Sequence, residues 1–222
     1  MEKNITYFFQ PVQQLFLSAI LADPYIRDTY YLTGGTALSA CYINHRLSDD
    51  IDLFSPQKLD EPRVVQIVSE RIGPIASKID YARIHDRLAY TIMFPHKKNL
   101  KVDIVYYPYT PIEQSKKTYK GLAIDSMADI GVNKLMTLTQ RTEAKDYVDL
   151  FYILKKYTMW ELRQGVADKF KMEIEPFYLS SLYMKATSLT ALPMMKKKLK
   201  LEELQKFFKN QALTLASRFV KA

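Results

Sequence analysis

Two carboxylates separated by one residue stand in the run DIDLF, residues 50–54, where polar and apolar side chains alternate. On a strand, successive side chains point to opposite faces, so Ile51 and Leu53 would enter a core. Asp50 and Asp52 would then lie together on the other face. Two neighbouring carboxylates in an apolar strand are costly unless a cation neutralises them. Mg²⁺ suits this role, because it prefers one or two carboxylates together with substrate phosphates.

A pair of glycines, Gly34 and Gly35, lies between a β-rich run at residues 30–33 and an apolar segment of helical character. Glycines at such a junction let backbone N–H groups approach a phosphate, and the helix N-terminus adds a favourable dipole. Thr36 adds a hydroxyl beside them. Alone, a glycine pair often makes only a turn, and D-x-D is often a solvated edge. Together, the two motifs predict chemistry on a nucleoside triphosphate.

A third carboxylate, Asp103, lies in the run KVDIV at residues 101–105. Its neighbours Val102 and Ile104 would face the core of a strand, which leaves Asp103 on the opposite face. The alternative is a surface aspartate on an edge strand. Asp86 and Asp125 are weaker candidates for a third carboxylate, because both lie near expected turns.

The motifs GGTAL at 34–38 and HRLSDDIDLF at 45–54 resemble those of the AbiEii abortive-infection toxins, which are MenT-like nucleotidyltransferases of the DNA polymerase beta superfamily. The motif resemblance covers residues 30–157. It implies transfer of a nucleoside monophosphate from an NTP such as ATP to an acceptor hydroxyl, with loss of pyrophosphate. It also implies two Mg²⁺ ions held by Asp50, Asp52 and Asp103, with the terminal phosphates held by the residues of the glycine turn, namely Gly34, Gly35 and Thr36.

A second set of family positions lies further along the chain, at Lys134, Arg141, Lys145, Asp146 and Asp149. The resemblance implies that Lys134 binds the nucleotide phosphates and that Asp146 belongs to the active site. From the residues alone, a lysine among apolar neighbours needs an anion. Lys145 and Asp149 are four residues apart and could simply stabilise a helix.

Two residues between the main motifs have open roles. Arg46 could contact a triphosphate with its planar guanidinium, or could pair with Asp49 or Asp50 to fix the loop. Ser48 could contact a phosphate or the metal, or could be a turn hydroxyl. His45 has meaning only as part of this motif.

We expect an α+β fold in which residues 1–122 form a nucleotidyltransferase-like mixed sheet with flanking helices. Residues 123–222 would form a helical bundle that closes over the nucleotide and contributes binding residues. A capping box is expected at Ser126 and Asp129. The helices are expected at 10–21, after the glycines, 60–72, from 126, 143–154, 159–170, 176–186 and 201–219, and the strands at 30–33, 50–54, 81–84, 88–94 and 100–105.

The chain is basic, with 32 Lys and Arg against 24 Asp and Glu, a net charge of +8. The surplus is concentrated in residues 191–222, which suits a polyanion such as RNA or else a solvated helix face. The single cysteine, Cys41, fits a reducing compartment and a buried apolar position. No apolar run of 18 residues and no signal peptide is evident, so a cytoplasmic protein without membrane contact is expected.

The resemblance further implies a toxin of a type IV-like toxin–antitoxin system, with a cognate antitoxin and with the 3′ end of tRNA as acceptor. Three alternatives stay open: an enzyme that modifies a small molecule, an enzyme that modifies a protein hydroxyl, and a non-catalytic relative that binds RNA or a partner. The intact Asp50, Asp52 and Lys134 argue against the last.

Overall fold

The computed structural model describes residues 6–217 and divides the chain into two compact units. We call them unit 1 and unit 2. Unit 1 comprises Met1–Tyr42, Ser48–Thr110 and Gln114–Ser126, and unit 2 comprises Ile43–Leu47, Pro111–Glu113 and Met127–Ala222. Two short segments that the sequence analysis placed in the first domain therefore belong with the helices. The domain boundary at 122/123 stays a prediction.

Unit 1 is built on one mixed sheet of seven strands in the order β3-β4-β5-β2-β1-β7-β6. Strands β2 and β5 are parallel, β1 and β7 are parallel, and the other neighbours are antiparallel. The mixed sheet confirms the expected fold class. The strands are β1 (Tyr31–Thr33), β2 (Ile51–Ser55), β3 (Lys78–Ile84), β4 (Arg87–Met93), β5 (Leu100–Tyr106), β6 (Thr118–Tyr119) and β7 (Leu122–Ile124).

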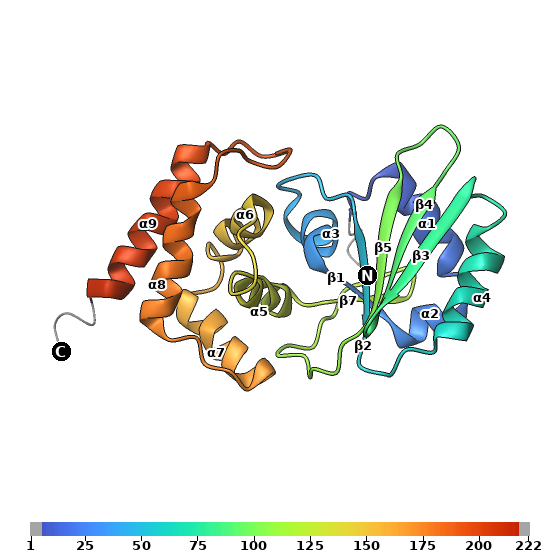
Figure 1. Ribbon diagram of the computed structural model, residues 1–222, viewed down its shortest axis with the longest axis horizontal. Coiled ribbons are helices and arrows are strands. Elements are labelled where there is room, and N and C mark those ends of the chain that lie inside the picture. Colours follow the sequence, from blue (N-terminus) through green and yellow to red (C-terminus); the bar gives the residue numbers. More distant parts are fainter. Residues whose placement is uncertain (1–5, 218–222) are drawn as a thin grey trace. The chain divides into compact units, whose positions relative to one another are not determined.

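Alternation along β2 separates the two faces of this sheet as expected. Ile51 and Leu53 are fully buried, whereas Asp52 and Phe54 are half-buried. Helices α1 (Pro11–Ile20) and α4 (Glu61–Ile72) contact each other and lie on one side of the sheet (Figure 1). The short helix α3 (Gly34–Leu38) follows β1 and continues into a π-helical turn, Ser39–Ile43.

Three short elements of unit 1 were not expected from the sequence. Helix α2 (Pro24–Thr29) follows the helix expected at 10–21, in a region where no helix was expected. The Asp23 carboxylate accepts from the N–H of Tyr25, and proline at the first helical position is favourable. Strands β6 and β7 have two and three residues and join through Gly121, which has a φ of +85°. Such short runs carry too few residues for an alternation pattern.

Unit 2 is helical, as expected. Its helices are α5 (Met127–Thr137), α6 (Ala144–Ile153), α7 (Met159–Phe170), α8 (Pro176–Met184) and α9 (Leu201–Ser217), with a 3₁₀ turn at Lys185–Ser188. Helices α8 and α9 lie side by side (Figure 1). The expected end of the last helix at Phe219 lies outside the described residues. Over residues 6–217, no helix combines the length and apolar character needed to cross a membrane.

The expected capping box at Ser126 and Asp129 stays a prediction. The Asp129 carboxylate accepts from the N–H groups of Ile112 and Glu113 and from Nζ of Lys169, at 2.9, 3.0 and 2.7 Å. Burial raises the pKa of Asp129, but these hydrogen bonds and the lysine charge outweigh burial and lower the pKa overall. Asp129 thereby attaches the segment Pro111–Glu113 to the helices of unit 2.

Candidate active site

Asp52 and Asp103 lie directly opposite each other on the neighbouring strands β2 and β5. The prediction that Val102 and Ile104 are buried while Asp103 faces the other way is confirmed. Because paired residues on adjacent strands point to the same face, the two carboxylates stand side by side on the face opposite the buried one. The register, which the sequence could not supply, therefore brings two of the predicted site residues together.

The electrostatics of this pair involve a cation and a further carboxylate. Nη1 of Arg87 lies 3.2 Å from Oδ2 of Asp103. Burial raises the pKa of Asp103, the charge of Arg87 lowers it, and the charge of Asp50 raises it, with a net increase. Asp50 is therefore near enough to influence Asp103, and the three predicted carboxylates belong to one electrostatic group.

Gly34 lies against the Asp52 carboxylate. Its φ is +73°, and a Cβ atom at this position would stand 2.1 Å from Oδ2 of Asp52. Any other residue would be strained by the backbone and would displace the carboxylate. Thr33, the preceding residue, pairs with Asp52 across β1 and β2. The glycine motif and the D-x-D motif therefore meet at these residues, as the sequence suggested.

Thr36 and Asp50 are linked through the backbone. The buried Thr36 hydroxyl donates to the carbonyl oxygen of Asp50, which lies just before the start of β2. Thr36 therefore helps to position Asp50, whereas its contact with a phosphate stays a prediction. Gly35 is buried within α3, and its predicted contact with the terminal phosphates also stays a prediction.

The donor chemistry of Asp50, Asp52 and Asp103 fits a hard divalent cation, because all three offer carboxylate oxygens. Arg87 offsets only part of their negative charge. In the described part of the chain, no group of three or more His, Cys, Asp or Glu side chains has a ready-made metal geometry. The two-metal arrangement therefore stays a prediction that these carboxylates suit by their chemistry.

A second cluster of charges lies in unit 2 around Asp149, which is 0% exposed. Its carboxylate accepts from Nε2 of His45 at 2.8 Å and from Nε and Nη2 of Arg46 at 2.6 and 2.7 Å. Nζ of Lys134 lies 2.7 Å from its other oxygen. Burial raises the pKa of Asp149, but Lys134, Arg46 and His45 outweigh burial and hold that pKa far below its usual range.

Lys134 also binds Asp146, at 2.7 Å from Nζ to Oδ1, and Arg141 donates to the other oxygen of Asp146 at 2.8 Å. Burial lowers the pKa of Lys134, but its two aspartates raise it overall. The anion that the sequence analysis required for this lysine is therefore supplied by Asp146 and Asp149. Binding of the nucleotide by Lys134, and an active-site role for Asp146, stay predictions.

Two residues on and near α6 have partners that were not predicted. Arg46 pairs with Asp149, so its guanidinium is used within unit 2. Lys145 lies 2.9 Å from Glu143, so the expected helix pair with Asp149 is absent. A phosphate contact of Arg46 stays a prediction, and its observed task is to attach the segment Ile43–Leu47 to helix α6.

His45 has a larger structural role than its place in the motif suggested. Its side chain is fully buried, and its ring lies 5.0 Å from that of Tyr152. Burial lowers the pKa of His45, so the neutral ring donates from Nε2 to Asp149. Its Nδ1 has no hydrogen-bond partner among the described residues. Little in the sequence indicated that His45 is buried, because the residues around it have neither helical nor strand periodicity.

The loop before β2 is held from helix α1. The amides of Gln10 and Gln13 both donate to the carbonyl oxygen of Ser48 at 2.8 Å, and Gln10 also reaches Asp49. Neither glutamine was predicted as a site residue from the sequence. A phosphate or metal contact of the Ser48 hydroxyl stays a prediction.

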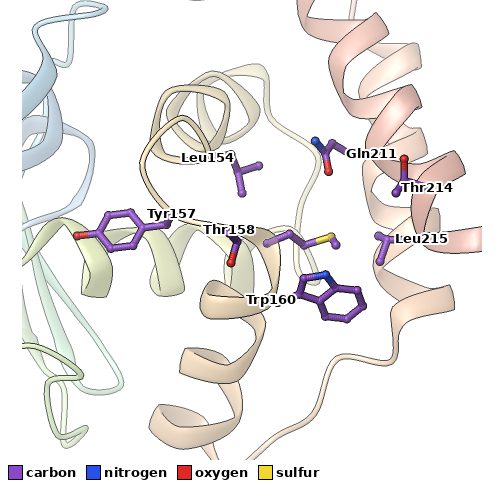
Figure 2. Close-up of a pocket in the computed structure, with 8 residues that line it drawn as sticks. Leu154, Tyr157, Thr158, Trp160, Gln211, Thr214 and Leu215 are labelled. Atoms are coloured by element: carbon purple, nitrogen blue, oxygen red, sulfur yellow. The ribbon is translucent and has the colours of Figure 1, made fainter. Parts of the chain in front are cut away.

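Unit 2 also contains a pocket of about 280 Å³ between the turn after α6, the start of α7 and the end of α9 (Figure 2). No predicted site residue lines it. Its walls combine apolar, aromatic and polar side chains, and the lining residues are Leu154, Tyr157, Thr158, Met159, Trp160, Gln211, Thr214 and Leu215.

Solved structures share this fold. A protein of H. pylori described as a candidate nucleotidyltransferase has a TM-score of 0.60 and is 25% identical, with coverage of 94% of this chain and 95% of its own. MenT4, a nucleotidyltransferase toxin of Mycobacterium tuberculosis H37Rv, has a TM-score of 0.56 at 13% identity, over 92% of this chain and 82% of its own. The fold is therefore that of the nucleotidyltransferases, in agreement with the carboxylates beside Gly34.

Residues 15–215 match the family model described as "Nucleotidyl transferase AbiEii toxin, Type IV TA system". The chain therefore belongs to the AbiEii nucleotidyltransferase toxin family, which confirms the resemblance seen in the motifs. An uncharacterized protein of Aquifex aeolicus is 30% identical over 141 residues, or 63% of this chain. The match spans 64% of that relative's length.

Proposed function

We propose that the protein is a Mg²⁺-dependent nucleotidyltransferase that moves a nucleoside monophosphate from an NTP to an acceptor hydroxyl, and that it is the toxin of a toxin–antitoxin pair. The observation that carries the proposal is the pairing of Asp52 with Asp103 on β2 and β5, beside Gly34. The proposed acceptor is the 3′ end of tRNA, and the proposed partner that controls activity is a cognate antitoxin.

In the proposed reaction, the acceptor oxygen bonds to the α-phosphorus as the bond to the bridging oxygen breaks, and pyrophosphate leaves. Asp50, Asp52 and Asp103 would hold the metal, which would neutralise triphosphate charge. Asp103 would take the hydroxyl proton.

The backbone N–H groups of Gly34 and Gly35 would contact the terminal phosphates, with Thr36 holding Asp50 in place. Lys134 would stabilise the negative charge on the departing pyrophosphate, and Asp146 would orient its ammonium group. Arg46 would not contact the nucleotide directly, since its guanidinium is bound to Asp149.

The test uses purified protein, Mg²⁺, each α-³²P-labelled NTP and total bacterial RNA. Asp52→Asn removes a proposed metal ligand with little change of shape, and Asp168→Asn makes the same substitution at an exposed position of α7. Label in tRNA-sized RNA with wild type and Asp168→Asn, and not with Asp52→Asn or with EDTA, is the expected result.

Other outcomes would change parts of the proposal. Label on the protein itself would replace tRNA by a protein hydroxyl as acceptor. Label in neither RNA nor protein, with NTP binding retained, would favour a small-molecule acceptor. Absence of NTP binding would refute the enzymatic proposal and leave a binding protein.

A further inference from the structure

Four lysines gather in the segment Met194–Lys200, which we call the basic segment. They are Lys196, Lys197, Lys198 and Lys200, and all are exposed. From the sequence alone, these lysines could form a polyanion site or a solvated helix face. Helix α9 begins at Leu201, so these lysines do not lie on a helix face.

The backbone of the basic segment is held by main-chain hydrogen bonds to the segment Ile43–Leu47. The N–H of Leu47 donates to the carbonyl oxygen of Met194 at 2.8 Å, and those of Lys196 and Lys197 donate to that of His45 at 2.9 and 3.0 Å. Met195 forms an antiparallel bridge with Arg46. Because a held backbone loses less conformational freedom when a ligand binds, its lysines are better placed to bind than those of a loose tail.

The segment Ile43–Leu47, which we call the partner segment, is itself attached through buried side chains. His45 and Arg46 bind Asp149 of α6 through side chains that are nearly or fully buried. The basic segment therefore rests on a network that extends into the core of unit 2.

The four ammonium groups have no carboxylate partner within residues 6–217. Lys196 donates to Oδ1 of Asn44 at 3.0 Å, and Nζ of Lys197 lies 5.8 Å from the centre of the Tyr152 ring. The next acidic residues in the chain are Glu202 and Glu203. They lie in the first turn of α9, where their negative charges interact favourably with the helix dipole. Unit 2 as a whole has 18 Lys and Arg against 11 Asp and Glu, a net charge of +7 out of +8.

Chain connectivity limits the distance between the partner segment and the proposed metal ligands. Only Ser48 and Asp49 separate Leu47 from Asp50. Three residues span at most about 11 Å between Cα atoms, whatever the arrangement of the two units. The residue that binds Met194 therefore stays within a short reach of Asp50.

We propose that the basic segment binds the phosphodiester backbone of a nucleic-acid strand. Lys196 and Lys200 are four residues apart, so their Cα atoms lie at most about 14 Å from each other, and their long side chains can meet several successive phosphates. A single triphosphate would use fewer of them. That the bound strand is the acceptor of the transferred nucleotide rests on the proposed function. Binding of the strand does not depend on it. The ligand chemistry is common to RNA and DNA.

The test compares two double variants that remove the same charge. Lys198→Gln with Lys200→Gln alters exposed side chains of the basic segment, and Lys97→Gln with Lys98→Gln alters exposed side chains in the β4–β5 loop. Fluorescence anisotropy measures the affinity of each full-length protein for labelled bacterial tRNA, a 20-nucleotide RNA and the matching DNA, without NTP and over a range of KCl.

We expect the basic-segment variant to bind about tenfold or more weakly at 0.1 M salt, with a salt-dependence slope smaller by about 1 to 2. The loop variant should stay within about twofold of wild type. Circular dichroism and NTP binding should match wild type for both variants. Loss of affinity for all three probes, or for the RNAs alone, supports the site and shows whether the ribose hydroxyl matters.

Equal affinity of wild type and the basic-segment variant would overturn the site, as would an equal loss in both variants, since the effect would then follow net charge alone. The proposed function fails separately. A wild type that binds RNA through the basic segment but transfers no label refutes the transferase and retains the site. A variant with normal binding and normal transfer refutes only the site.

Discussion

Neutralising Asp149 should destabilise unit 2 more than any exposed aspartate does. Asp149→Asn keeps the shape of the side chain but removes its charge beside Arg46 and Lys134, whose side chains are 4% and 9% exposed. Removing one partner of a buried ion pair costs about 3–5 kcal/mol, because the remaining charge stays buried. Lys134 keeps Asp146, so we expect the lower end, about 3 kcal/mol.

Urea unfolding followed by tryptophan fluorescence measures this loss. Trp160 is the single tryptophan of the chain and lies in unit 2, so its emission reports on the affected unit. With a slope of about 1–3 kcal/mol per molar urea, the midpoint should fall by roughly 1–3 M. This is a large part of a typical stability of about 5–15 kcal/mol.

The matched control is Asp168→Asn, an exposed aspartate of α7 that accepts only from the amide of Gln164 among the described contacts. Its expected effect is within about 0.5 kcal/mol. A loss below about 1 kcal/mol for Asp149→Asn would show that the cluster of Arg46, His45 and Lys134 is not a buried charge network, and the reasoning would be refuted.

Three further predictions address the sheet and the histidine. Gly34→Ala should lower transferase activity by about 100-fold, because its Cβ would displace the Asp52 carboxylate by more than an ångström. Arg87→Gln should raise the pKa of Asp103 further, so the acidic limb of kcat/KM against pH should move to higher pH. Burial lowers the pKa of His45, so the histidine binds a proton more weakly in the folded state than in the unfolded state. The free energy of unfolding should therefore fall as pH drops below about 6.5, and His45→Gln should flatten this slope.

Each of these has a matched control. Gly121→Ala places a Cβ at another positive φ, against the flexible Arg27 side chain, so it should cost stability and leave activity intact. Arg83→Gln removes an exposed cation that binds Glu61, and the acidic limb should not move. His96→Gln, in an exposed turn, should leave the pH slope of stability unchanged. Equal effects in variant and control would contradict the corresponding explanation.

The sheet residues of the candidate site could be predicted because alternation is a local property. A period of two places Asp52 and Asp103 opposite buried neighbours, without knowledge of any partner strand. Their adjacency could not be predicted, since parallel pairing of β2 and β5 joins runs that are 51 residues apart in register. The short strand β7 was missed for a related reason: its place in the sheet depends on β1 more than on its own three residues.

The helices of unit 2 could be predicted from their apolar periodicity, but their charge network could not. Asp149 was interpreted as a partner of its helical neighbour Lys145, because a sequence shows directly only the pairs three or four positions apart on one helix. Its observed partners are Lys134 on another helix, and His45 and Arg46, which lie more than 100 positions earlier. Gln10 and Gln13 were missed similarly, since their partner is a backbone carbonyl, which has no sequence signature.

The assignment of Ile43–Leu47 to unit 2 has a consequence for the order in which the molecule is completed. During synthesis, His45 and Arg46 leave the ribosome about 100 residues before Asp149, and Met195 follows later still. The strands on either side of this segment can pair early, whereas the segment itself has to wait for a distant helix. Contacts of such long sequence separation form slowly. Cutting the chain at residue 126 would therefore yield two fragments that both lack a native neighbour: one would carry an arginine without its aspartate, and the other an aspartate without its arginine.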